Sequence, residues 1–245
     1  SSKEGWRIAV SLIYGMTGDR EKAAEIINKL ELCTDQESKV QFTMADRKIN
    51  AVMSTSAGRL FDGVSAILGI RRKSTFEGEA SMALEFAAEE YIERRQTEIS
   101  EDEKSLWNDM QAEMEETECH EIFVDKGKSM ADRLLLNTES LVKTILDRRL
   151  NGEEAGRLAY FFHEELASQI TEACIKIREQ SGCNKAALSG GVFQNRLLLE
   201  LTDHMLEDRG FEVLKHQLVP PNDGGIALGQ AVYAMAYLYR KVRNK

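Results

Sequence analysis

Two glycine-containing stretches near the end of the 245-residue chain have the residue types and spacing of an anion site. In the first, an apolar run ends at Ser189-Gly190-Gly191, and an amphipathic run begins near Phe193. A buried strand that ends in a glycine turn and opens into a helix presents unpaired backbone N–H groups at the positive end of the helix dipole. Glycines let the backbone approach a phosphate because no Cβ intervenes. The pattern predicts a phosphate site, and a plain strand–helix turn is the alternative.

The second stretch, residues 219–230, contains both prolines of the chain, Pro220 and Pro221, followed by Asn222, Asp223 and a Gly-Gly pair. Two prolines stiffen the chain, and the two glycines make the next positions more flexible. We therefore expect a fixed turn that places Asp223 at the start of a helix. A carboxylate in that position is either an N-cap or a ligand of a metal or substrate.

The hydrophobic spacing predicts the elements that position these two stretches. The fold class is α/β (α+β overall), with a mainly helical segment over 1–119 and an α/β nucleotide-binding lobe with a partly parallel sheet over 120–245. The acidic stretch 98–118 is typical of a solvated helix or linker. We expect helices over 5–30 (with one break), 36–49, 54–70, 78–95, 139–150, 156–181, 194–207 and 226–239, and strands over 120–124, 133–136, 186–188 and 211–214.

The composition excludes several classes of protein. A net charge of −9 argues against nucleic acid as a partner, because such surfaces need a basic footprint. No apolar run is long enough to span a bilayer and no signal-peptide pattern opens the chain, so we expect a cytoplasmic protein without a membrane partner. The four cysteines lack C-x-x-C spacing, which gives no indication of a zinc site. The first residue is not methionine, which suggests a piece of a longer protein.

Four motifs, in order, resemble the carbamoyltransferases that mature [NiFe] hydrogenases, the HypF family. They are SAGRLFD at 56–62, FEGEA at 76–80, SGGVFQNRLLLE at 189–200 and PPNDGGIALGQA at 220–231. The resemblance implies an actin-like, sugar-kinase-like nucleotide-binding domain of two α/β lobes, similar to the domain of tRNA threonylcarbamoyltransferases. The chain resembles only the C-terminal part of the family, so the two-lobed domain would be incomplete.

The resemblance also implies a reaction. In the family, an upstream domain forms carbamoyl-adenylate from carbamoyl phosphate and ATP, and the lobed domain passes the carbamoyl group to the C-terminal cysteine of a partner maturation protein. The product supplies the cyanide ligands of the hydrogenase iron. The implied cofactors are ATP or carbamoyl-adenylate and a divalent metal, which would be Fe, Zn or Mg. A glycine nest and a cation would stabilise the charge that develops on the leaving phosphate.

Individual positions of the motifs take roles from the family. In the matching motifs, the nucleotide-binding positions are Ser189, Gly190, Gly191, Asn195, Asp62 and Gly78, and the metal-binding position is Asp223. Within this set, the two glycines would contact phosphate and Asp62 would contact the ribose. Asp62 is also unusual for its place in a predicted helix, because Asp has a poor helix propensity there.

Some features depart from the family. The family's His-x-x-x-His metal ligands have no counterpart here, and Phe76 and Glu79 stand where the family usually has Tyr and Gln. We therefore expect an incomplete metal site and no turnover by this chain alone. His163 matches a Phe-His of the family, and a structural role is the favoured interpretation for a lone helical histidine. Two alternatives stay open: a related carbamoyltransferase with another acceptor, and a non-catalytic interaction module that keeps the fold.

Overall fold

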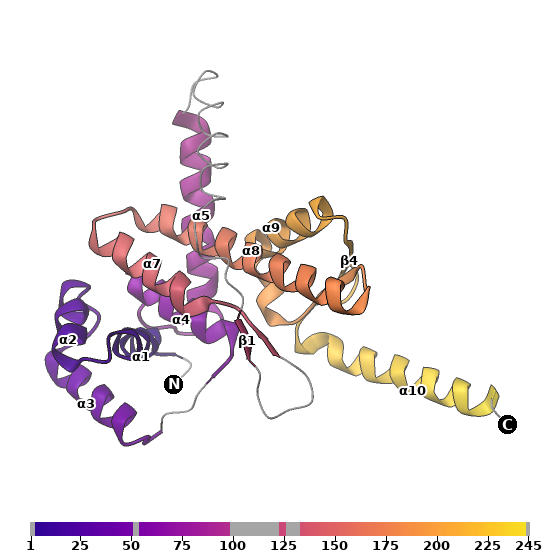
Figure 1. Ribbon diagram of the computed structural model, residues 1–245, viewed down its shortest axis with the longest axis horizontal. Coiled ribbons are helices and arrows are strands. Elements are labelled where there is room, and N and C mark those ends of the chain that lie inside the picture. The colour runs from indigo at the N-terminus through magenta and orange to yellow at the C-terminus, as the bar shows by residue number, and fades with distance from the viewer. Residues whose placement is uncertain (1–2, 51–53, 99–122, 126–132, 244–245) are drawn as a thin grey trace.

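The computed structural model describes residues 3–50, 54–98, 123–125 and 133–243, and the chain is mostly helical with two small sheets (Figure 1). The helices are α1 (Gly5–Thr17), α2 (Arg20–Lys29), α3 (Asp35–Asp46), α4 (Ala57–Ile67), α5 (Glu79–Glu98), α7 (Thr138–Leu150), α8 (Ala155–Ser181), α9 (Arg196–Asp208) and α10 (Ile226–Arg243), with 3-10 turns η2 (Gly191–Gln194) and η3 (Asp223–Gly225). The strands are β1 (Phe123–Asp125), β2 (Arg133–Leu135), β3 (Lys185–Leu188) and β4 (Glu212–Lys215). Each predicted helix and strand that falls on described residues is present, with its ends shifted by a few residues. The predicted helix or linker over 98–118 lies outside the described residues from residue 99 onward.

Helices α1 to α5 and α7 to α9 share one continuous core of buried apolar side chains. At its centre, Phe61 of α4 meets Phe162 of α8 edge to face, with ring centroids 4.8 Å apart. Two glycines bring neighbouring helices into close contact. A Cβ on Gly63 would lie 2.7 Å from Leu12 of α1, and a Cβ on Gly156 would lie 2.9 Å from the carbonyl oxygen of Ala87 in α5. The core crosses the division that we place between residues 119 and 120, and the division itself stays a prediction.

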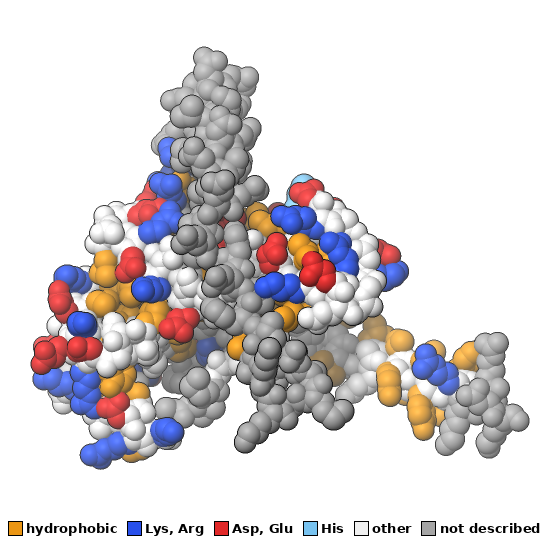
Figure 2. Space-filling view, in the orientation of Figure 1, with side chains coloured by type: hydrophobic (Ala, Val, Ile, Leu, Met, Phe, Trp, Pro, Cys, Tyr) orange, Lys and Arg blue, Asp and Glu red, His pale blue; other side chains and the backbone are white. Residues whose placement is uncertain are grey.

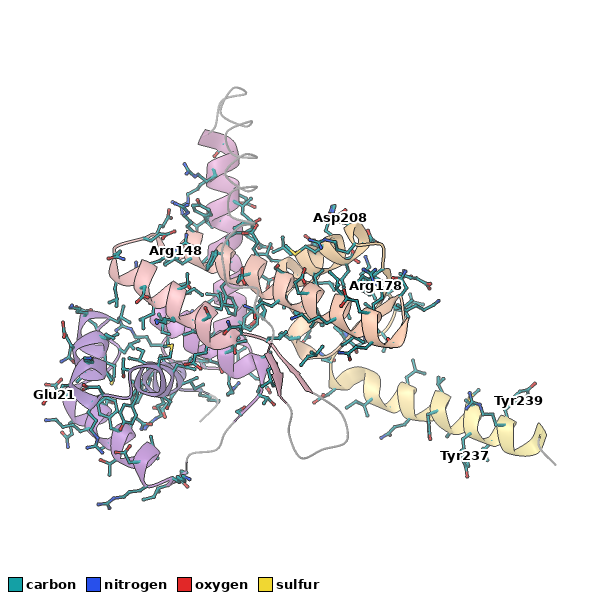
Figure 3. The ribbon with its side chains drawn as sticks, in the orientation of Figure 1. Glu21, Arg148, Arg178, Asp208, Tyr237 and Tyr239 are labelled. Atoms are coloured by element: carbon teal, nitrogen blue, oxygen red, sulfur yellow. The ribbon has the colours of Figure 1, made fainter. Side chains whose placement is uncertain are left out.

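Local signals set the ends of the central helices. The capping box of Thr34 and Glu37 starts α3, since each side chain bonds the other residue's backbone N–H. Helix α8, the longest of the described helices, ends at Gly182, which adopts the left-handed conformation with φ 71°. Near this end, Arg178 lies 4.2 Å over the ring of Phe211 and donates to the carbonyl oxygen of Arg209 (Figure 3). These contacts fix the end of α8 against the start of β4.

Strands β3 and β4 are parallel, and Leu188 pairs with Lys215 at their carboxyl ends. Only one face of β3 is buried, since Ala186 and Leu188 pack with Leu206 and Phe211. The strand expected to be buried is therefore buried on one face and exposed on the other. Strands β1 and β2 form a separate antiparallel pair.

Helix α10 extends away from the rest of the molecule (Figure 1). Apolar side chains lie along its visible surface (Figure 2), and Tyr237 and Tyr239 project from its far half (Figure 3). Tyr233 and Met235 are 74% and 68% exposed. None of the helices in the described ranges combines the length and the apolar character that a membrane crossing needs.

Candidate functional site

The structure brings the two glycine-containing stretches together at one edge of the β3–β4 sheet. Because the strands are parallel, the chain leaves both of them at the same edge, which is where ligands bind in open α/β sheets. The N–H of Gly190 donates to the carbonyl oxygen of Pro221 over 2.9 Å. Beside this bond, Ser189 Oγ lies 2.8 Å from His216 Nε2. The backbone of the two stretches is therefore in direct contact at this edge.

Glycine is required at the centre of this edge. Gly190 has φ 100° and ψ 163°, a conformation open essentially to glycine alone. Gly191 is exposed, and the atom nearest to a Cβ added there would be Gln194 Oε1 at 3.9 Å. In the η2 turn, the N–H groups of Gly191 and Val192 have no acceptor within the turn itself. A small anion could therefore approach these two donors from solvent.

The start of α9 differs from the sequence-based expectation. Buried Glu85 of α5 accepts hydrogen bonds at one oxygen, Oε1, from the N–H groups of Arg196, at 2.5 Å, and Leu197, at 3.3 Å. Asn195 Oδ1 accepts from the N–H of Leu198 over 2.8 Å. The expectation of unpaired N–H groups at the start of this helix is wrong, because a carboxylate and an amide from the protein bind them. The donors open to a ligand lie one turn earlier, in η2.

Glu85 is the internal anion that faces the positive end of α9. Burial raises the pKa of its carboxyl, while the two backbone N–H groups act in the opposite direction. No sequence motif points to this residue. The only signal was a glutamate among apolar residues in the 78–95 helix, and its partner lies more than a hundred positions away along the chain.

Asn195 and His163 form a buried polar contact between α8 and α9. Asn195 Nδ2 lies 2.9 Å from His163 Nε2, and His163 Nδ1 lies 2.7 Å from the carbonyl oxygen of Ala159. Since Asn195 Oδ1 accepts from Leu198, its Nδ2 donates, and the imidazole carries its single proton on Nδ1. Burial lowers the pKa of His163 to about 4, and the bond to Ala159 opposes this shift. His163 is thus a neutral structural residue, as favoured by its sequence context.

This network uses one of the two donors and one of the two acceptor positions of the Asn195 side chain. The residue is 4% exposed, with its oxygen on Leu198 and its nitrogen on His163. In this arrangement Asn195 fixes the start of α9 directly behind the η2 turn. A direct contact between its side chain and a nucleotide stays a prediction.

Asp62 lies in α4, and Gly78 lies immediately before α5. Asp62 in α4 is 4% exposed, and burial raises the pKa of its carboxyl against the opposing charge of Arg59, whose Nη2 lies 2.8 Å from Oδ2. Its neighbour Phe61 contacts the His163 ring, with centroids 5.6 Å apart. Gly78 has φ 81° and accepts at its carbonyl oxygen the N–H of Met82 at the start of α5. Helix α5 therefore connects Gly78 to Glu85, and through Glu85 to α9.

Asp223 is exposed, and the capping role that the sequence allowed for it belongs to its neighbour. Asn222 Oδ1 accepts the N–H of Gly224 over 2.9 Å and caps η3. The carboxylate of Asp223 is therefore not needed as the cap of this turn and could accept a cation. Across the described ranges, no group of three His, Cys, Asp or Glu side chains is placed to hold a metal ion. A metal-ligand role for Asp223 stays a prediction.

Comparison with known sequences defines the family of the chain. Residues 1–230 match the sequence profile described as "Carbamoyltransferase, Kae1-like Domain, second subdomain". The chain belongs to this family of carbamoyltransferases, and the resemblance inferred from the four motifs is confirmed.

Its relatives include HypF proteins of several organisms. A probable carbamoyltransferase HypF of Methanocaldococcus jannaschii is 28% identical over 232 residues, which is 95% of this chain and 26% of that protein. The carbamoyltransferase HypF of Synechocystis is 30% identical over 235 residues, 91% of this chain and 26% of that protein. The chain thus spans about a quarter of the length of these curated relatives.

Solved structures agree with this assignment. A full-length HypF in a phosphate- and nucleotide-bound form superposes with a TM-score of 0.73 at 31% sequence identity, over 97% of this chain and 27% of that one. HypF of T. kodakarensis superposes with a TM-score of 0.65 at 21% identity and supports the fold alone. The mixed, mainly helical fold with a small sheet is therefore a HypF-type fold, and the actin-like description of its lobe stays a prediction.

Proposed function

We propose that the chain is the part of a hydrogenase-maturation carbamoyltransferase that holds carbamoyl-adenylate while its carbamoyl group passes to a partner protein. Family membership and the phosphate- and nucleotide-bound state of a HypF relative support a nucleotide ligand. The observation that carries the proposal is the hydrogen bond from Gly190 to Pro221, because it joins two motifs at the ligand-binding edge of a parallel sheet. ATP dependence and a cytoplasmic location belong to the same proposal.

In this reaction the C-terminal cysteine thiolate of the partner attacks the carbamoyl carbon. A C–S bond forms, the bond from that carbon to the phosphate oxygen breaks, and AMP leaves with the electron pair. Negative charge grows on the leaving phosphate, where the N–H groups of Gly191 and Val192 can stabilise it. The acceptor thiolate belongs to the partner, so the chain needs no cysteine nucleophile of its own.

The other residues hold the backbone of the site in place. Glu85 and Asn195 fix the start of α9, and Gly190 supplies the sharp turn that exposes η2. A divalent cation, when bound, would offset the negative charge of the phosphate. Asp223 would hold it together with ligands outside this chain. The chain alone is therefore expected to bind AMP weakly and to transfer no carbamoyl group.

A titration of AMP into the ¹⁵N-labelled chain tests the proposed site. The amide signals of Gly191 and Val192 are expected to shift in a saturable way, while those of α2, on the opposite side of the molecule, stay unchanged. Absence of any saturable shift up to millimolar AMP, with and without Mg²⁺, would contradict a nucleotide site in this chain. The choice between a partner cysteine and another acceptor requires a transfer assay.

A further inference from the structure

Ser189 and His216 occupy equivalent places at the sheet edge. Each is the first residue beyond its strand, and the last pair of the parallel register is Leu188 with Lys215. The two side chains meet at 2.8 Å between Oγ and Nε2, and both residues are exposed. His216 lies outside the four motifs that resemble the HypF family.

The fold itself gives little reason for this contact. The strands are already joined by their backbone ladder, and Lys185 with Glu212 forms an ion pair at the opposite end of the pair. An exposed hydrogen bond adds little net stability, because water replaces either partner. A role in binding is therefore a better explanation than a role in folding.

The direction of the hydrogen bond decides what the serine can do. A hydroxyl has one proton, so a Ser189 that donates to the imidazole cannot also donate to a ligand. If instead Nε2 carries the proton and donates to Oγ, the hydroxyl proton is free to point at an anion. A hydroxyl that accepts one hydrogen bond is also a stronger donor for the next.

We propose that Ser189 and His216 form one contact unit for the phosphate of a nucleoside monophosphate or its acyl derivative, with His216 as a positioning residue that makes Ser189 a donor. The unit lies next to the N–H groups of Gly191 and Val192, so it adds a third donor to the same anion. It relies on the nucleotide site of the proposed function. The nearby cation Lys215 is bound by Asp203.

Neutral donors suit the chemistry of this leaving group. The phosphate of an acyl-adenylate carries one negative charge, and a second charge develops on it as AMP departs. Donors aimed at that phosphate therefore bind the departing AMP more strongly than the intact adenylate, which favours the transfer step. This places the unit on the leaving group and not on the carbamoyl group.

The test compares AMP and adenosine binding in the chain and four variants by NMR titration: Ser189→Ala, His216→Leu, His216→Gln and the double variant Ser189→Ala/His216→Leu. Loss of a hydrogen bond to a charged group is expected to weaken AMP binding about tenfold in each of Ser189→Ala and His216→Leu. The double variant should bind AMP no more weakly than Ser189→Ala, because His216 acts through the serine. His216→Gln places an amide donor near the position of Nε2 and should restore most of the affinity, and adenosine binding should be equal in all.

Four results would overturn the proposal. Additive losses in the double variant would make His216 an independent contact. Equal losses for AMP and adenosine would show a structural effect. Unchanged AMP binding in Ser189→Ala would show that Ser189 and His216 do not contact the phosphate, although the nucleotide site would stand. No AMP binding by the unaltered chain would overturn the proposed function together with this inference.

Discussion

The buried imidazole of His163 should make the stability of the fold depend on pH. The ordinary pKa of 6.5 falls to about 4 in the folded chain, because burial disfavours the charged ring. On acidification the unfolded chain takes up this proton near pH 6.5, while the folded chain resists it down to about pH 4. The contribution of His163 to stability is therefore fully present above pH 6.5 and is lost as the pH falls toward 4.

The size of the effect is set by the two pKa values. One pKa unit corresponds to about 1.4 kcal/mol, so the free energy of unfolding should fall by about 2 kcal/mol between pH 7 and pH 5 and by about 3 kcal/mol by pH 4. A typical domain has only about 5–15 kcal/mol to lose. The effect is therefore large enough to measure.

Urea unfolding followed by far-UV circular dichroism measures it, because the chain is mostly helical. The matched control is His163→Gln, which can hydrogen-bond at the same place and cannot titrate. The difference in unfolding free energy between the two proteins isolates His163 from the carboxyl groups, which titrate in both. Low protein concentrations are needed, since the isoelectric point of about 5.2 favours association near that pH. A difference that stays constant from pH 7 to pH 4 would refute the assignment of His163 as a buried neutral ring.

The remaining predictions concern the sheet edge. Glu85→Gln keeps an acceptor for the start of α9 and removes a buried charge, so the free energy of unfolding at pH 7 should be unchanged or higher. Glu85→Ala removes the acceptor and should lower the free energy of unfolding in urea by about 1–3 kcal/mol. Equal losses in both variants would contradict the capping role of Glu85. Gly190→Ala should cost about 1–3 kcal/mol, because alanine is strained at φ 100°, and an unchanged melting temperature would show that the turn relaxes. Asp223→Asn should melt like the unaltered chain without metal, because Asn222 is the cap and Asn caps as well as Asp, and should lose any stabilisation by added Mg²⁺, Zn²⁺ or Fe²⁺; metal stabilisation that persists in the variant would contradict the ligand role of Asp223.

The local features of the fold could be predicted from the sequence. Apolar spacing predicted α8 and α9, and Gly182 marked the end of α8 because glycine tolerates the left-handed conformation. The alternation of strands and helices after residue 180 indicated a parallel pair, which β3 and β4 form. The mid-helix Asp62, which is unusual by helix propensity, is itself buried.

Contacts between distant segments could not be predicted in the same way. Glu85 and Arg196 meet because α5 and α9 pack on the same core, and no local pattern encodes that packing. Ser189 and His216 meet because two strands pair in one particular register, and a shift of one residue would separate them. Sequence periodicity identified the apolar positions of α10. It did not indicate that these apolar side chains are exposed, because exposure depends on which other segments pack against the helix.

In our proposal, this chain supplies the carbamoyl-transfer site of a HypF-type enzyme. The most direct test replaces the matching 235-residue stretch of Synechocystis HypF with this chain and measures transfer from carbamoyl phosphate and ATP to a peptide that ends in cysteine. Mass spectrometry should detect one carbamoyl group on the peptide's cysteine, with release of AMP, and Gly190→Ala in the exchanged part should reduce the yield. A folded hybrid that forms carbamoyl-adenylate but leaves the cysteine unmodified would contradict the claim.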